Sequence, residues 1–163
     1  MADLVTDVAA LAAALARPGQ PGETYDCLEG VCRQRMGHRL FTVLAWDATS
    51  GDVERVHTSR PDAYPLKGRK PMGPTAWGAH VLHCGEPWRG EGADAIRWAF
   101  PDHALILSLG CDSCLNAPVR YDGATLGVVS VLDAAGTHTD RHLAELVTLA
   151  PFLVPPLLAR TPS

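Results

Sequence analysis

Two runs of strand-forming residues, 115–121 and 124–132, are separated by only Asp122 and Gly123. An Asp-Gly pair between such runs favours a two-residue hairpin turn, because glycine readily adopts the positive φ that this turn requires. Strands joined this tightly pair antiparallel, since a parallel pair needs a long crossover connection. The sequence therefore predicts an antiparallel hairpin in the last third of the chain.

A second hairpin is predicted nearer the N-terminus. The runs 40–46 and 53–59 lack helical periodicity, and Ser50-Gly51 between them is a turn signal. The segment that follows, 60–74, contains four prolines, two glycines and four basic residues. We expect it to form a long irregular surface loop, and structured loops of this length often carry function.

Helices are predicted where apolar residues recur at helical spacing or where capping residues delimit a short segment. The N-terminal segment carries such a stripe, formed by Leu4, Val8, Leu11 and Leu15. Pro151 must end or kink the last helix, so the chain beyond it is expected to be irregular. The predicted helices cover residues 3–17, 24–36, 74–84, 93–100 and 139–150.

Helices and hairpins follow one another in an order typical of an α+β domain, in which helices pack on one side of an antiparallel sheet. A chain of 163 residues is long enough for one domain and short for two. We therefore expect a single domain over residues 1–163. Its parts would be an N-terminal helix (3–17), a core (about 24–150) and a C-terminal tail (151–163).

Composition restricts the environment and the partners of the chain. A net charge of −4 offers no general attraction to nucleic acid, and an apolar content of 47% is too high for a disordered chain. The longest apolar stretches, 8–16 and 149–159, are each too short to span a bilayer. Five cysteines without a signal peptide favour free thiols in a reducing cytosol. We expect a cytoplasmic protein with no nucleic-acid or membrane partner.

The hairpin sequence from Leu115 to Leu132 resembles the signature hairpin of GAF domains, with its Pro118, basic Arg120, Asp122-Gly123 turn and Gly127-Val128 step. Residues 41–47 resemble the first strand of that family and residues 139–149 its last helix, so the resemblance covers most of the chain. It implies a six-stranded antiparallel sheet with a ligand cavity. The cavity would lie between one sheet face and a cap formed by residues 60–100, with the 109–116 loop beside it.

The resemblance also implies which side chains would meet a ligand. The candidate ligand-binding residues are Trp77, His80, Asp112, Asn116, Ser130, Tyr64 and Arg97, with Cys111 facing the same pocket. Each has a simpler interpretation: the aromatic residues also suit a core, and Arg97 also suits a solvated helix face. GAF domains bind varied small molecules or none, so the fold alone leaves the ligand open.

One GAF subfamily, the free methionine-(R)-sulfoxide reductases, suggests an enzymatic alternative. The Cys111-Asp112 pair, followed by Asn116, resembles the Cys-Asp…Asn loop of that subfamily. The resemblance implies that the Cys111 thiolate attacks the sulfoxide and that Cys84 or Cys114 resolves the resulting sulfenic acid.

Three departures weigh against that activity. Trp77 stands where the subfamily has a cysteine, and Ala117 stands where it has a carboxylate that holds the substrate ammonium. Ser130 and Leu132 take the places of two further carboxylates. We therefore favour a signalling or sensing module that binds a small molecule or a partner protein and catalyses no reaction, with an unknown small-molecule ligand and no cofactor. No metal site is expected, because the single Cys-x-x-Cys of Cys111 and Cys114 lacks a second ligand pair.

The N-terminal helix bears on the oligomeric state. First and last helices commonly pair across a dimer interface in GAF domains, so the apolar stripe of residues 4–15 is expected to support a homodimer. The alternative is that the stripe packs on its own domain, since most helices are stabilised by tertiary packing of their apolar face.

Overall fold

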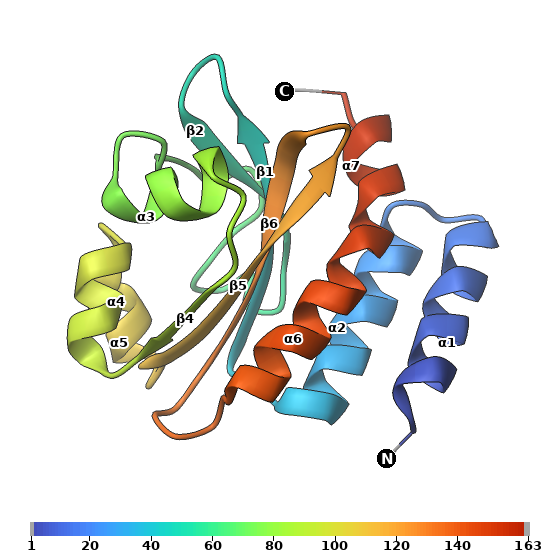
Figure 1. Cartoon of the computed structure of the whole chain (residues 1–163), viewed down its shortest axis with the longest axis horizontal. Helices are drawn as coiled ribbons and strands as arrows, with labels where there is room; N and C mark the ends of the chain where they lie inside the picture. The colour runs from blue at the N-terminus through green and yellow to red at the C-terminus, as the bar shows by residue number, and fades with distance from the viewer. Residues whose placement is uncertain (1, 162–163) are drawn as a thin grey trace.

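The computed structural model describes residues 2–161. Its centre is a six-stranded sheet with the strand order β3-β2-β1-β6-β5-β4 (Figure 1). All five strand pairs are antiparallel. The strands are β1 (Leu40–Asp47), β2 (Asp52–Thr58), β3 (Arg69–Pro71), β4 (Trp88–Glu91), β5 (Ser113–Tyr121) and β6 (Ala124–Asp133). The α+β class and the antiparallel six-stranded sheet expected from the sequence are confirmed.

The predicted hairpin turn adopts the conformation that the Asp-Gly pair favours. Asp122 has φ +49° and Gly123 has φ +75°, and the flanking residues Tyr121 and Ala124 pair directly. Two consecutive positive φ values match the twist of the strands that they join. The β5–β6 hairpin lies next to β1, so the central strands of the sheet come from both halves of the chain.

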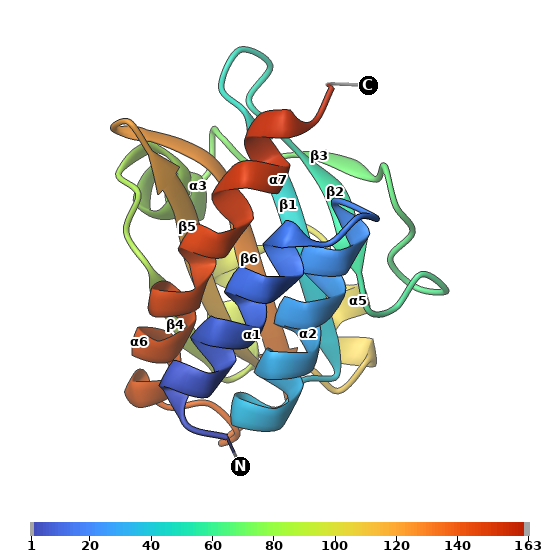
Figure 2. The same ribbon diagram turned by 90° about the vertical axis from the view of Figure 1, so that its right-hand side faces the viewer.

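One sheet face is covered by the long helices, as Figures 1 and 2 show. In Figure 2, α1 lies in front of α2 on the side away from the sheet. These helical elements are α1 (Leu4–Ala16), α2 (Gly22–Met36), α6 (Asp140–Leu149), the 3-10 turn η2 (Ala150–Leu153) and α7 (Val154–Ala159). Phe41, Val43 and Val131 of the sheet share a buried cluster with Leu28 and Leu146 of the helices. The prediction that helices 3–17, 24–36 and 139–150 share one face is confirmed.

The opposite face of the sheet is covered by a cap of short elements (Figure 1). They are α3 (Ala76–Gly78), the π-helical turn η1 (Ala79–His83), α4 (Ala93–Ala99) and α5 (His103–Ser108). A second buried cluster joins Trp77, Val81 and Ile96 of the cap to Leu44 and Val128 of the sheet. The sheet thus separates two cores, one under the long helices and one under the cap.

Three features differ from the sequence-based expectations. The 60–74 segment contains the short edge strand β3, because residues 69–71 pair with β2. Residues 88–91 form the second edge strand, β4, which the sequence did not reveal. The expected irregular tail is helical to Ala159, because Pro155 and Pro156 lie in the first turn of α7, where a missing N–H breaks no helical hydrogen bond.

The last helical stretch also corrects an expectation about apolar length. The helix continues through Pro151, so residues 140–159 form one stretch that by length and composition alone could cross a membrane. Core helices of soluble proteins pass the same test, and here Leu146, Leu149 and Leu153 are buried against the sheet.

The apolar stripe of α1 packs on its own chain. Leu11 is fully buried, and Leu4 and Val8 pack against the cluster under the long helices. Asp7, on the same helix, bonds to Arg35 of α2 at 2.7 Å. These contacts agree with the alternative that the stripe packs on its own domain. The homodimer stays a prediction.

Gly127 provides a test of how closely β6 approaches β1. A Cβ atom at Gly127 would lie 2.2 Å from the Leu44 carbonyl oxygen, which belongs to the neighbouring backbone. We expect Gly127→Ala to lower the free energy of unfolding by about 1–3 kcal/mol, because the two strands must separate. Urea denaturation measures this loss.

The matched control is Gly30→Ala in the interior of α2, where an added Cβ meets nothing within 4 Å. We expect Gly30→Ala to stabilise the protein by up to about 1 kcal/mol, because alanine is the better helix former. A Gly127→Ala protein as stable as the wild type would contradict the close approach of β6 to β1.

Candidate functional site

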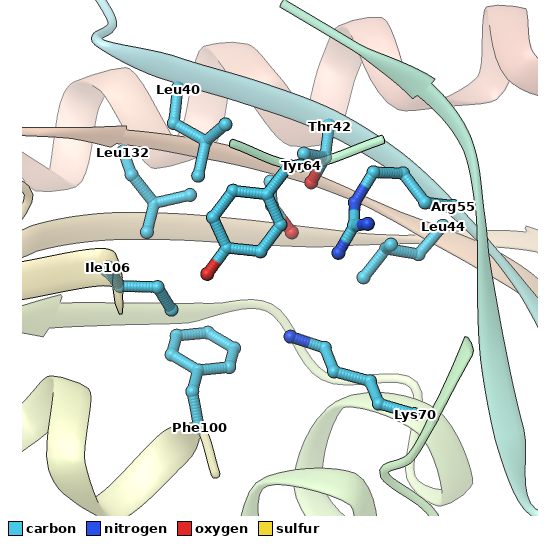
Figure 3. A pocket seen from close by; sticks show the side chains of 10 residues that line it. Leu40, Thr42, Leu44, Arg55, Tyr64, Lys70, Phe100, Ile106 and Leu132 are labelled. Carbon is cyan, nitrogen blue, oxygen red and sulfur yellow. The ribbon is translucent and has the colours of Figure 1, made fainter. Parts of the chain in front are cut away.

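A small enclosed cavity lies between the cap and the sheet. Its volume is about 20 Å³, which is room for roughly one water molecule. The sheet contributes residues that alternate along β1 and β6 and therefore share one face. These are Leu40, Thr42, Leu44, Ser130 and Leu132, with Arg55 from β2. Four further side chains close the other side (Figure 3): Tyr64 and Lys70 from the 60–74 segment, and Phe100 and Ile106 from the cap.

Arg55 is a buried cation on the cavity wall. The residue is 7% exposed, and its Nη1 donates to the Pro65 carbonyl oxygen at 2.9 Å. The guanidinium carbon lies 4.5 Å from the centre of the Tyr64 ring. Its Nε is buried and has no hydrogen-bond partner among residues 2–161. Burial lowers the pKa of Arg55, against the opposing effect of Tyr64 and Asp102, but a guanidinium stays charged in proteins.

Lys70 is the second cation at the cavity, and it is paired. Its Nζ lies 2.9 Å from Oδ1 and 3.0 Å from Oδ2 of Asp102. The Tyr64 hydroxyl donates to the same carboxylate at 2.9 Å. Burial lowers the pKa of Lys70, while the Asp102 carboxylate opposes that shift and the Arg55 charge adds to it. Asp102 thus connects the 60–74 segment to the turn before α5.

A chain of buried hydrogen bonds lies beside the cavity. Trp77 Nε1 donates to Asn116 Oδ1 at 3.0 Å, and Asn116 Nδ2 donates to Ser130 Oγ at 2.8 Å. The Cys114 thiol also donates to Asn116 Oδ1, at 3.5 Å. Because its oxygen accepts from Asn116, Ser130 retains its own hydroxyl hydrogen for a group inside the cavity.

The structure brings some of the predicted site residues together and separates others. Tyr64 and Ser130 line the cavity. Asn116 donates a hydrogen bond to Ser130 and accepts one from Trp77, so both residues help to position Ser130. His80 does not face the cavity: it is exposed, and its Nε2 lies 3.0 Å from the Pro87 carbonyl oxygen.

Arg97 and Asp112 also lie outside the cavity lining. Arg97 is exposed and pairs with Asp94 at 2.8 Å, as its simpler interpretation required. Asp112 Oδ1 accepts from the Ala135 backbone N–H at 2.6 Å, so it holds the loop after β6. The resemblance implied that these residues lie near a ligand, but side-chain direction in loops and short helices is set by long-range packing, which the sequence alone does not reveal.

The cysteines do not form an exposed reactive pair. All five are free thiols, and Cys111 and Cys114 are fully buried while Cys84 is exposed. Cys111 does not face the cavity as the resemblance implied, because it belongs to the buried cluster under the cap and is not among the lining residues. Burial, with a smaller contribution from Asp133, raises the pKa of Cys111 to about 11. Within residues 2–161, no group of three His, Cys, Asp or Glu side chains could hold a metal ion.

Sequence reasoning missed Arg55, Lys70 and Asp102. The only available signal was that Arg55 alternates with Val53 within a β run, and Val53 is buried under the cap. Lys70 was assigned to a solvated basic cluster of the loop. Its burial depends on Asp102, which lies 32 residues further along the chain.

Comparisons with known proteins identify the fold. No protein-family model matches the sequence, and no curated protein matches it significantly. The GAF domain of an Acinetobacter phosphoenolpyruvate-protein phosphotransferase superposes with a TM-score of 0.75 at 17% identity, over 97% of this chain and 95% of that one. The Coxiella burnetii counterpart gives a TM-score of 0.74 at 17% identity, over 95% and 92% of the two chains.

A third similar structure is an enzyme. The free methionine-R-sulfoxide reductase from Neisseria meningitidis, solved with its substrate, gives a TM-score of 0.71 at 18% identity, over 98% of this chain and 93% of that one. The chain therefore has the GAF fold, as its hairpin sequence indicated, and identities this low establish the fold alone.

The burial of the thiols predicts their order of reaction. We expect iodoacetamide to label Cys84 first and Cys27 next, and to label Cys32, Cys111 and Cys114 only when the protein unfolds. Burial raises the pKa of Cys27, which slows that half-buried thiol further. Peptide mass mapping over time measures the order. Labelling of Cys111 before Cys84 in the folded protein would contradict its buried position.

The Asp102 pair predicts a pH dependence. Burial alone would raise the pKa of Asp102, but the Lys70 charge and the bonds from Lys70 and Tyr64 outweigh it and leave the pKa below 3.8. Its stabilising contribution is therefore fully present above pH 3.8 and is lost as the pH falls through the lower, native-state value.

We expect Asp102→Asn to be less stable than the wild type by about 1–3 kcal/mol at neutral pH, and this gap to close in acid. Urea denaturation of both proteins over a pH series measures the gap. The control is Asp94→Asn, which removes an exposed ion pair and should cost less than about 1 kcal/mol. A gap that does not change with pH would show that the Asp102 charge is not responsible.

Proposed function

We propose that this chain is a sensory GAF domain that binds a small molecule in the cavity under its cap and catalyses no reaction. The observation that carries the proposal is the chemistry of the cavity wall. A buried cation with an unused donor, a hydroxyl free to donate and apolar side chains face one enclosed space. A few polar groups converging in an apolar cavity are typical of a ligand site.

The thiols support the absence of catalysis. Cys111 does not line the cavity, and a raised pKa leaves almost none of its thiol as the nucleophilic thiolate at neutral pH. The two candidate resolving thiols lie in different environments, because Cys114 is buried and Cys84 lies on the surface. Neither arrangement favours attack on a sulfoxide followed by disulfide formation.

The cavity charge also weighs against the reductase alternative. That subfamily holds a substrate ammonium with carboxylates, and this cavity presents the cations Arg55 and Lys70 instead. The carboxylate of Asp102, which contacts Lys70 and Tyr64 of the cavity wall, is already bound by both. The superposition on the Neisseria reductase favours the reductase alternative, so the experiment tests reductase activity directly.

The first arm of the test measures turnover. A coupled thioredoxin–NADPH assay with free methionine-(R)-sulfoxide is run on the wild type, on Cys111→Ser and on the control Cys27→Ser. We expect no turnover by any of the three. Turnover that Cys111→Ser abolishes and Cys27→Ser retains would replace the binding proposal with the reductase.

The second arm measures binding. We expect at least one class in a panel of small metabolites to raise the melting temperature. At a hundredfold excess of ligand over Kd, binding should add about 2.7 kcal/mol to the free energy of unfolding. Ser130→Ala should reduce this shift, because it removes a donor from the cavity wall. Failure of every compound to stabilise the wild type would refute the binding function.

A further inference from the structure

Arg55 makes a specific demand on whatever occupies the cavity. Its charge is withdrawn from water, and no ion pair joins it to a carboxylate in the part of the chain that the structure describes. Removing a charge from water costs several kcal/mol unless an opposite charge or hydrogen bonds compensate. The compensation visible is partial: one bond to the Pro65 carbonyl and the face of the Tyr64 ring.

The carboxylate whose charge acts on Arg55 is already occupied. It belongs to Asp102, and its two oxygens are held by Lys70 and Tyr64. Figure 3 shows the ends of Arg55 and Lys70 pointing into the same space from opposite sides. The cavity therefore combines two cations with one internal carboxylate and retains an excess of positive charge.

The apolar part of the cavity wall restricts the chemistry of the ligand outside its charged group. Leu40, Leu44, Phe100, Ile106 and Leu132 surround the polar groups with apolar surface. A short hydrocarbon body suits such a wall, since burying it is favourable. A ligand ammonium does not, because it would be a third cation with no free carboxylate to meet it.

We propose that the cavity binds a small organic acid as its carboxylate anion, with the carboxylate on the Arg55 guanidinium and a short uncharged body against the apolar wall. This inference rests on the proposed binding function and names its ligand class. A guanidinium suits a carboxylate better than an ammonium does, because its planar fork can donate two parallel hydrogen bonds. Arg55 Nε is buried without a hydrogen-bond partner among residues 2–161, and it would supply one of those donors once the wall has moved to admit the acid.

The size of the cavity adds a condition. A volume of about 20 Å³ holds little more than one water molecule, so a ligand must displace part of the wall. We expect Tyr64 and Lys70, which come from the 60–74 segment, to be the side chains that move, which would break their bonds to Asp102. We expect small acids of two to four carbon atoms to bind before larger ones.

The experiment compares molecules that differ in charge and little in shape. Propanoate, propanamide, propylammonium and alanine are titrated into the wild type by calorimetry, with melting temperatures measured in parallel. We expect propanoate to bind and the other three to bind at least about tenfold more weakly, since a hydrogen bond to a charged group contributes about 1.5–3 kcal/mol. This comparison needs no variant.

Two variants locate the site. Arg55→Gln removes the buried charge, and we expect it to weaken propanoate binding by about 10- to 100-fold. Arg97→Gln is the matched control, because Arg97 is an exposed arginine outside the cavity, paired with Asp94. It should leave the affinity for propanoate unchanged. If Arg55→Gln does not fold, the comparison of the four compounds on the wild type still decides the ligand class.

Each outcome separates the inference from the function on which it rests. Equal binding of propanoate and propanamide, or equal binding of propanoate to the wild type and Arg55→Gln, would overturn the carboxylate assignment. The binding function would then stand on whichever compound stabilises the protein. No stabilisation by any compound, charged or neutral, would overturn both.

Discussion

Antiparallel pairing of β6 with both β1 and β5 decides what each face of the sheet meets. Along β6, Val129 and Val131 are buried under the long helices, while Val128, Ser130 and Leu132 face the cap. The pairing fixes this alternation, because a shift of one residue would exchange the two faces. The cavity exists only in this register, which places Ser130 opposite Asn116 of β5 and Thr42 of β1.

The central elements could be predicted because their signals are local. The Asp122-Gly123 turn and the helical spacing in residues 3–17 each depend on residues a few positions apart. Edge strand β4 could not be predicted in this way, because four residues, Trp88–Glu91, become a strand only through pairing with β5. Tertiary pairing decides short strands more than intrinsic preference does.

The candidate site also contains residues that the sequence could predict and residues that it could not. Trp77, Asn116 and Ser130 were anticipated from the family resemblance, whereas the face of Arg55 was not, because Arg55 alternates with both Val53 and His57, which lie on opposite faces of the sheet. The register of β2 against β1 shifts between Val43 and Leu44, so that His57 pairs with Val43 and Arg55 with Leu44. Strict alternation would have put Arg55 and His57 on one face. Instead His57 bonds to Glu29 of α2 at 2.7 Å, and Arg55 faces the cavity.

A crystal structure with 3-bromopropanoate tests the central claim most directly, because anomalous scattering from bromine locates the acid independently of its shape. We expect a bromine peak among Leu40, Phe100 and Leu132, with a carboxylate oxygen within hydrogen-bonding distance of Arg55 Nε. We also expect Tyr64 or Lys70 to have moved to make room. A fully occupied acid bound only at surface cations such as Arg97, with Arg55 Nε still unpartnered, would contradict the carboxylate site at Arg55.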